Sequence, residues 1–94
     1  MVIATCSIEL HLPANGSLKG KRSVIKSICT RVSQRFNVSI AEVDHHDLWQ
    51  RATLGVSAVG TDPAYLHKLL SQVVQWIEFH RPDVELLDYR IEMM

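Results

Sequence analysis

Apolar residues recur with two different periods along this chain, and the order of the periods is the strongest constraint on its fold. The first apolar set alternates with polar residues, as in a strand with one buried face: Val2, Ala4, Cys6, Ile8, Leu10 and Leu12. Two later sets recur at three- and four-residue spacing, as in amphipathic helices. They are Ile25, Ile28, Cys29, Val32 and Phe36, and then Leu66, Leu69, Leu70, Val73, Val74 and Ile77. A chain with this pattern is expected to pack helices against a sheet.

Turn and cap residues give the expected boundaries of each element. Pro13 to Gly16 ends the first strand, and Ser17 is placed to cap a helix over Leu18 to Arg35. Asp62 and Pro63 likewise start a second helix, because proline suits the first helical position. The remaining strands are predicted over Val38–Val43, Leu48–Val59 and Val84–Met93, with a hairpin loop at Asp44–Asp47.

The predicted order is strand–helix–strand–strand–helix–strand, which defines an α+β, ferredoxin-like two-layer sandwich. Right-handed crossovers place both helices on one face of a four-stranded antiparallel sheet, with the first and third strands at its centre. We expect one such domain over residues 1–94. The uncovered face of its central strands would carry small and mostly polar residues: Thr5, Ser7, Glu9, Thr53, Gly55 and Ser57.

The charges balance overall but not along the chain. Residues 1–41 hold six cations and one acid, a charge of +5, and residues 42–94 hold four cations and nine acids, a charge of −5. A net charge of zero argues against a strongly basic nonspecific nucleic-acid binder. The local excess of cations between Lys19 and Arg35 can still steer an anionic partner or orient self-association.

The chain opens without a basic leader, and no apolar run reaches membrane-spanning length. Cys6 and Cys29 lie far apart and form no CxxC pair, so free thiols in a reducing compartment are expected. Together these features predict a cytoplasmic protein. No cofactor is expected and no small-molecule ligand can be identified, since neither GxGxxG nor GxxxxGK[ST] occurs. No serine or cysteine lies in a recognisable nucleophile motif.

Four short segments in order along the chain resemble the bacterial YlxP-like family. They are Ser17-Leu18-Lys19-Gly20-Lys21-Arg22, Arg35-Phe36-Asn37-Val38, Ala41-Glu42-Val43-Asp44 and Asp47-Leu48-Trp49-Gln50-Arg51-Ala52. The resemblance implies a ferredoxin-like fold and supplies no catalytic residues. It also implies a link to RNA or the ribosome, because genes of this family often lie near those for translation factors and ribosome maturation. Gly20 departs from relatives that commonly carry an acidic residue between the two lysines.

The first candidate site is the start of the first helix, where four cations cluster: Lys19, Lys21, Arg22 and Lys26. Free N–H groups and the positive end of the helix dipole favour an anion at this position. Phosphate contacts of this kind would position a nucleic acid without reading its sequence. The alternative is a solvated helix face without a ligand.

The second candidate is the acidic and histidine-rich hairpin: Glu42, Asp44, His45, His46 and Asp47. Carboxylates and imidazoles can bind a divalent metal, but consecutive histidines on an extended chain point in different directions. We therefore expect a polar hairpin tip and no metal site. Glu42 and Asp47 could instead pair with Arg51 or with cations of the first helix.

The third candidate is Trp49 with Arg51, since both residue types are common anchors of protein interfaces. A tryptophan at this position could equally cap the edge of the core. Trp76 lies off the second helical stripe, near Tyr65, Phe79 and His80, and poses the same choice.

Our leading hypothesis is a small binding module, not an enzyme, that contacts RNA or the ribosome through its basic first helix. The alternative is a structural or protein-interaction domain, a homodimer, without nucleic-acid binding. The bare central strands argue against base stacking on the sheet, which is the usual mode of RNA binding in this fold. A metal-dependent enzyme at the hairpin is the third and weakest hypothesis.

Overall fold

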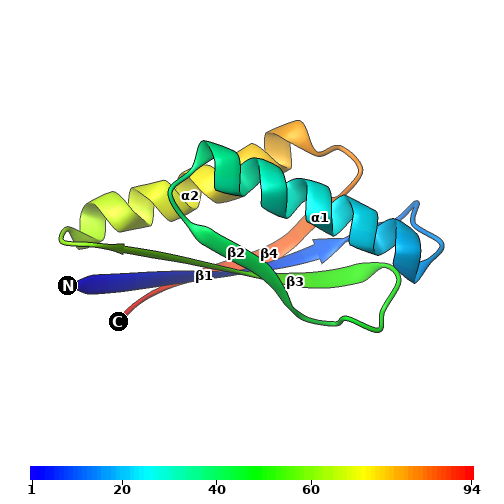
Figure 1. Ribbon diagram of the computed structural model, residues 1–94, viewed down its shortest axis with the longest axis horizontal. Helices are drawn as coiled ribbons and strands as arrows, with labels where there is room; N and C mark the ends of the chain where they lie inside the picture. The colour runs from blue at the N-terminus through cyan, green and yellow to red at the C-terminus, as the bar shows by residue number, and fades with distance from the viewer.

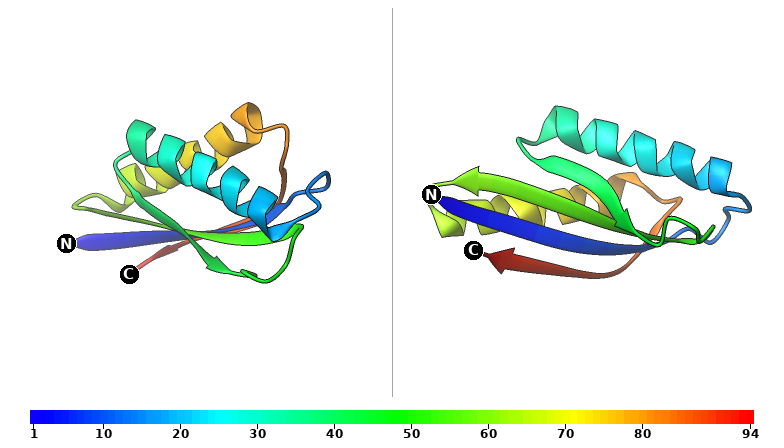
Figure 2. Two further views of the ribbon diagram at one scale, coloured as in Figure 1. Left: turned by 45° about the vertical axis from the view of Figure 1, so that its right-hand side comes forward. Right: turned by 60° about the horizontal axis from the view of Figure 1, so that its bottom comes forward.

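A computed structural model describes all 94 residues, and its six elements follow the predicted order (Figure 1). The elements are β1 (Val2–His11), α1 (Leu18–Arg35), β2 (Ser39–Asp44), β3 (Arg51–Gly60), α2 (Pro63–His80) and β4 (Glu85–Met93). The strands form one antiparallel sheet in the order β2-β3-β1-β4. Both helices cover the same face of this sheet, and the other face is uncovered (Figure 2). The ferredoxin-like prediction is confirmed.

The core lies between the sheet and the helices, and the alternation of β1 places it there. From Ala4 to Leu12 every second residue is buried, and β3 contributes Ala52 to Ala58 with the same period. Cys6 pairs with Val56 and Ser7 with Gly55, so the helix-facing residues of the two central strands lie side by side. The buried stripe of α2 runs from Leu66 to Ile77 and completes the core.

Both helices begin at the predicted caps. Ser17 Oγ accepts a hydrogen bond from the Gly20 N–H at 3.0 Å, and Asp62 Oδ1 accepts one from the Ala64 N–H at 3.0 Å. Pro63 occupies the first turn of α2, where its missing N–H costs no helical hydrogen bond. The first turn of α1 therefore already has an internal acceptor for one of its free donors.

The β2–β3 hairpin differs from the prediction, because β3 begins at Arg51 and not at Leu48. The loop consequently spans residues 45–50. The Gln50 carbonyl accepts a hydrogen bond from the Leu12 N–H at 2.9 Å, and the Leu48 N–H donates to the His45 carbonyl at 3.1 Å. The first bond continues the β1–β3 pairing one residue beyond Arg51, and the second closes the loop on itself.

The uncovered face contains a shallow hollow of about 400 Å³ over β1, β2 and β3. Small side chains line it, among them Ser7, Ser39 and Ser57. Val43 lies directly over Gly55, because a Cβ atom at Gly55 would come within 2.8 Å of Val43 Cγ1. Gly55 thus allows β2 to bring an apolar side chain onto this face.

Neither α1 nor α2 combines the length and apolar character needed to cross a membrane.

The two free thiols should react slowly in the folded protein. Burial raises the pKa of Cys6 to about 11, and burial together with the charge of Glu42 raises the pKa of Cys29. At pH 8 only about one Cys6 thiol in a thousand would be the reactive thiolate. We expect Cys6 in a Cys29→Ser variant to resist a disulfide reagent until guanidinium unfolds the chain. Rapid labelling of this folded variant would contradict the burial of Cys6.

Candidate functional site

Lys21 is a buried lysine at a position where α1 otherwise presents apolar residues. Its side chain is 1 % exposed, and it belongs to the same helical stripe as Ile25, Ile28 and Val32. The stripe points at the sheet, so the lysine ammonium lies beneath the β2–β3 loop. A lysine is seldom buried to this degree unless it is paired.

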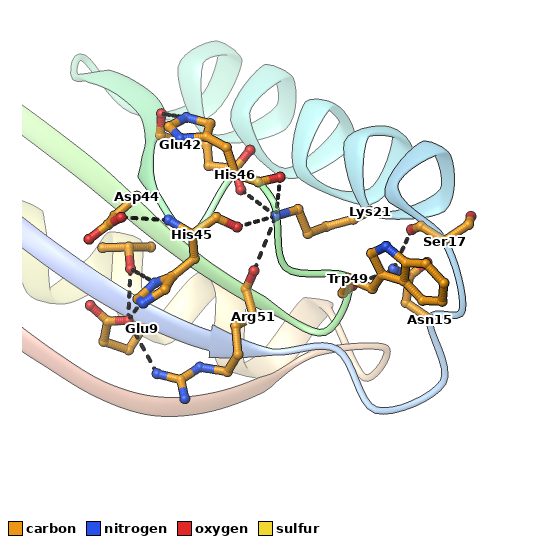
Figure 3. Close-up of polar contacts among 11 residues, drawn as sticks. Glu9, Asn15, Ser17, Lys21, Glu42, Asp44, His45, His46, Trp49 and Arg51 are labelled. Atoms are coloured by element: carbon orange, nitrogen blue, oxygen red, sulfur yellow. Dashed lines mark hydrogen bonds and ion pairs between the residues drawn. The ribbon is translucent and has the colours of Figure 1, made fainter.

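Four oxygen atoms surround the Lys21 ammonium (Figure 3). It donates to the carbonyls of His45 at 2.6 Å, His46 at 3.2 Å and Arg51 at 3.2 Å. Glu42 Oε2 lies 2.9 Å from the same nitrogen. The three carbonyls take the three ammonium protons, and Glu42 Oε2 has no hydrogen bond of its own. The carboxylate therefore balances the buried charge. We call Lys21, Glu42 and the three carbonyl groups the lysine cage.

The burial of Lys21 in the cage shows that one residue of the predicted anion-binding site was wrongly assigned. Lys21 cannot be part of an exposed anion surface, because its ammonium is enclosed and already neutralised. The alternative that Glu42 pairs with a cation of the first helix is confirmed, whereas Asp47 makes no ion pair. Lys21 precedes Ile25 and Ile28 at helical spacing, and Glu42 follows Ile40 at strand spacing. That signal in the sequence could have identified the pair.

His45 sits at the bend of the loop and is held from three sides. Its φ of 63° is left-handed, a conformation uncommon outside glycine. Its N–H donates to Asp44 Oδ1 at 2.7 Å, and its Nδ1 lies 2.8 Å from Thr53 Oγ1. Thr53 in turn donates its only hydroxyl proton to Glu9 Oε2 at 2.8 Å, so His45 Nδ1 must be the donor to Thr53. This chain of hydrogen bonds and the cage stabilise the strained residue together.

The two histidines of the loop face different partners. His46 Nε2 donates to the Glu42 carbonyl at 3.2 Å, whereas His45 Nδ1 donates to the Thr53 hydroxyl. No three histidine, cysteine or carboxylate side chains lie where they could jointly hold a metal ion. Arg51 reaches Glu9 Oε2 at 3.7 Å, which makes it the cation that balances this carboxylate on the uncovered face.

A second set of hydrogen bonds joins the β2–β3 loop to the β1–α1 loop. Asn15 Nδ2 donates to the Trp49 and Ser17 carbonyls, and Gln50 Nε2 donates to the Asn15 carbonyl at 3.1 Å. Gly20 makes room for this arrangement, because a Cβ atom there would overlap Asn15 Oδ1. The two loops therefore form a single rim at the start of α1.

Trp49 and Arg51, the predicted interaction residues, both reach solvent on this rim. The Trp49 residue is 55 % exposed, so it does not cap the core. Its carbonyl, not its indole, carries the tie to Asn15. The Arg51 side chain is 44 % exposed. Both remain available to a partner, and their role as interface anchors stays a prediction.

The other predicted anion-binding residues, Lys19, Arg22 and Lys26, are exposed on α1. Arg31 and Arg35 extend this set along the helix. None of the five has a carboxylate within 4.0 Å, and α1 contains no acidic residue. A hollow of about 510 Å³ on the same face has no hydrophobic lining. Its residues are Ser23, Lys26, Ser27, Thr30, Arg31 and Gln34. We call these five unpaired cations and this hollow the basic helix face.

Charge is separated between the two layers of the molecule. The helices hold seven cations and one acid, whereas the strands hold six acids and two cations. The imbalance between the two halves of the sequence is thereby converted into a difference between the helix layer and the sheet. An anionic partner would be attracted to the helices and repelled from most of the sheet.

The fold and these sites define a small ferredoxin-like α+β protein with a loop fixed by a buried lysine and a basic helix layer. A family model described as a protein of unknown function (DUF503) matches residues 3–91. The uncharacterized protein YlxP of Bacillus subtilis (strain 168) is 43 % identical over 77 residues, covering 82 % of this chain and 83 % of that protein. The chain belongs to this family, as its short motifs predicted.

Replacing Lys21 should test the structural role of the cage. Lys21→Met would leave Glu42 charged and unpaired in a largely buried position and would remove one donor from each of the three carbonyls. We expect a loss of about 3–5 kcal/mol in the free energy of unfolding, measured by denaturant titration. The double variant Lys21→Met/Glu42→Gln should recover part of that loss, because it removes the uncompensated charge.

Lys19→Met is the matched control, since the same change is made two residues away at an exposed position. We expect it to alter the free energy of unfolding by less than about 0.5 kcal/mol. Equal effects of the two single variants would show that the cage does not stabilise the fold.

Proposed function

We propose that this protein is a cytoplasmic binding module that contacts structured RNA, on the ribosome or elsewhere, through the basic helix face. The observation that carries the proposal is the set of five exposed cations on α1 without acidic partners: Lys19, Arg22, Lys26, Arg31 and Arg35. Cations in an ordinary solvated surface are commonly interspersed with acids. Here the charges are free to meet phosphates.

The side chains between these cations support the same partner. Ser23, Ser27 and Thr30 bring hydroxyl groups into the hollow, and Gln34 adds an amide. Such groups make many of the contacts between proteins and the phosphate and sugar backbone. The gene neighbourhood implied by the YlxP-like family points to the translation machinery as the source of that RNA.

The uncovered sheet face is a poor alternative for RNA. Thr5, Ser7, Gly55 and Ser57 offer no aromatic ring for a base to stack on. Tyr89 lines a further hollow on this face, but Glu9, Asp88 and Glu92 surround it, and Arg90 is the only cation that lines it. A phosphate backbone would therefore meet net negative charge there.

Binding to RNA should depend on salt and on the basic helix face. We expect a labelled structured RNA, and purified ribosomal subunits, to bind at 50 mM salt and to bind much more weakly at 200 mM salt. Arg31→Glu should weaken this binding, and Lys26→Glu/Arg31→Glu should weaken it further, because each change replaces a phosphate contact by repulsion. Fluorescence anisotropy at several salt concentrations is the measurement.

Arg90→Glu is the control, because it makes the same change in net charge at an exposed site on the opposite layer. Its effect on RNA affinity should be much smaller than that of Arg31→Glu. If all these variants bind RNA as the parent does, or if they lose affinity equally, the basic helix face is not the binding surface.

A second candidate is self-association through the uncovered face. Val43 and Val59 are more than half exposed there, although both are apolar. Arg90 lies among the acids on the same face, so two copies could place opposite charges against each other.

Multi-angle light scattering tests this candidate. We expect a dimer that Val43→Lys converts to a monomer, because the change places a charge in the apolar centre of the contact. A strict monomer at every concentration would contradict self-association and would leave RNA binding unaffected.

A further inference from the structure

A furrow runs between α1 and α2 on the outer side of the helix layer. One part of about 320 Å³ is lined by Arg31, Gln34, Arg35 and Trp76. The adjoining part, of about 300 Å³, shares Arg31 and Trp76 and continues to the turn after α2. Its remaining residues are His80, Arg81, Pro82 and Asp83. The furrow thus borders the basic helix face but differs from it in one respect, because it contains aromatic rings.

Trp76 and His80 form a stacked pair one helical turn apart. Their ring centroids are 5.1 Å apart and their planes differ by 15°. His80 Nδ1 donates to the Trp76 carbonyl at 3.0 Å, which fixes the imidazole against the indole. Trp76 packs partly on the core, whereas His80 is exposed. One imidazole face therefore rests on the indole, and the exposed part of the ring can meet a further planar ring.

The arginines of the furrow differ in whether they have a partner within the protein. Arg81 donates twice to the Asp83 carboxylate, at 3.0 and 2.7 Å, and once to Ser27 Oγ at 2.7 Å. It therefore fastens the turn after α2 to α1 and builds the wall of the furrow. Arg31 and Arg35 have no carboxylate partner. They lie one helical turn apart, so both guanidinium groups can face the same side of the helix.

We propose that this furrow binds one nucleotide of a single-stranded RNA segment. The base stacks on the Trp76–His80 pair, and Arg31 and Arg35 bind the adjacent phosphates. Aromatic stacking combined with cations along a groove is the general way in which proteins hold single-stranded nucleic acids. Gln34 lies beside the stack and offers an amide to a base edge. This inference rests on the proposed function and names the part of the RNA that the basic helix face would hold.

Two probes separate stacking from charge: a dodecamer of uridylate, which has little structure of its own, and inorganic polyphosphate, which has no bases. We expect His80→Ala and Trp76→Leu each to weaken uridylate binding by about fivefold or more, because a stacked base loses its platform. Polyphosphate affinity should stay unchanged in both variants. Arg31→Glu should weaken both ligands. In a Trp49→Phe background, uridylate should quench the fluorescence of the remaining Trp76.

His80 is exposed, so His80→Ala is expected to fold even if Trp76→Leu does not, and circular dichroism checks both. Unchanged uridylate binding in folded His80→Ala, with binding lost in Arg31→Glu, would overturn the stacking site and leave the proposed function standing. Failure of the parent protein to bind either probe or structured RNA would overturn both.

Discussion

The enclosure of the Lys21 ammonium is the interaction on which the loop end of this molecule depends. An isolated ammonium is costly to bury, and here three carbonyls and Glu42 compensate that cost. The carbonyls of His45, His46 and Arg51 must all turn inward to do so, and this requirement forces the loop around the end of the lysine side chain. The left-handed His45 and the late start of β3 occur together with this inward turn of the carbonyls. The cage thereby joins α1, β2 and β3 at a point where few apolar side chains are available.

The same enclosure determines which surfaces are left for a partner. With Lys21 withdrawn, the free cations of α1 lie on its outer side and along its border with α2. The acids gather in the strands, so the two faces of a protein without net charge carry opposite signs. A partner that carries phosphates can then bind one face in a defined orientation, because the opposite face repels it.

Periodicity, together with the turn and cap residues, was sufficient to predict the element order, both helix caps and the polarity of β1, because each depends on residues close together in the sequence. It was insufficient at the hairpin, where Leu48 to Gln50 follow a strand pattern. Leu48 instead bonds to His45 within the loop, and Trp49 and Gln50 bond to the β1–α1 loop. Lys21 was misassigned because a lysine next to Lys19 and Arg22 looks like part of a solvent-exposed cluster. Two spacings indicated that Lys21 is buried and that Glu42 is largely buried. Lys21 is in helical register with Ile25 and Ile28, and Glu42 is in strand register with Ile40. The furrow could not be predicted, since it requires knowing that Arg31 and Arg35 lie beside Trp76.

The contact between Gly20 and Asn15 has a consequence for how sequences in this family can diverge. A Cβ atom at position 20 would overlap Asn15 Oδ1, so any side chain there requires the Asn15 amide, which donates to the Trp49 carbonyl, to shift. The residue at position 20 therefore constrains the residue at position 15, and the two positions are not expected to vary independently. A chain with an acidic residue at position 20 would need another way to hold the rim. A sequence change at the start of α1 thus affects the β2–β3 loop that presents Trp49.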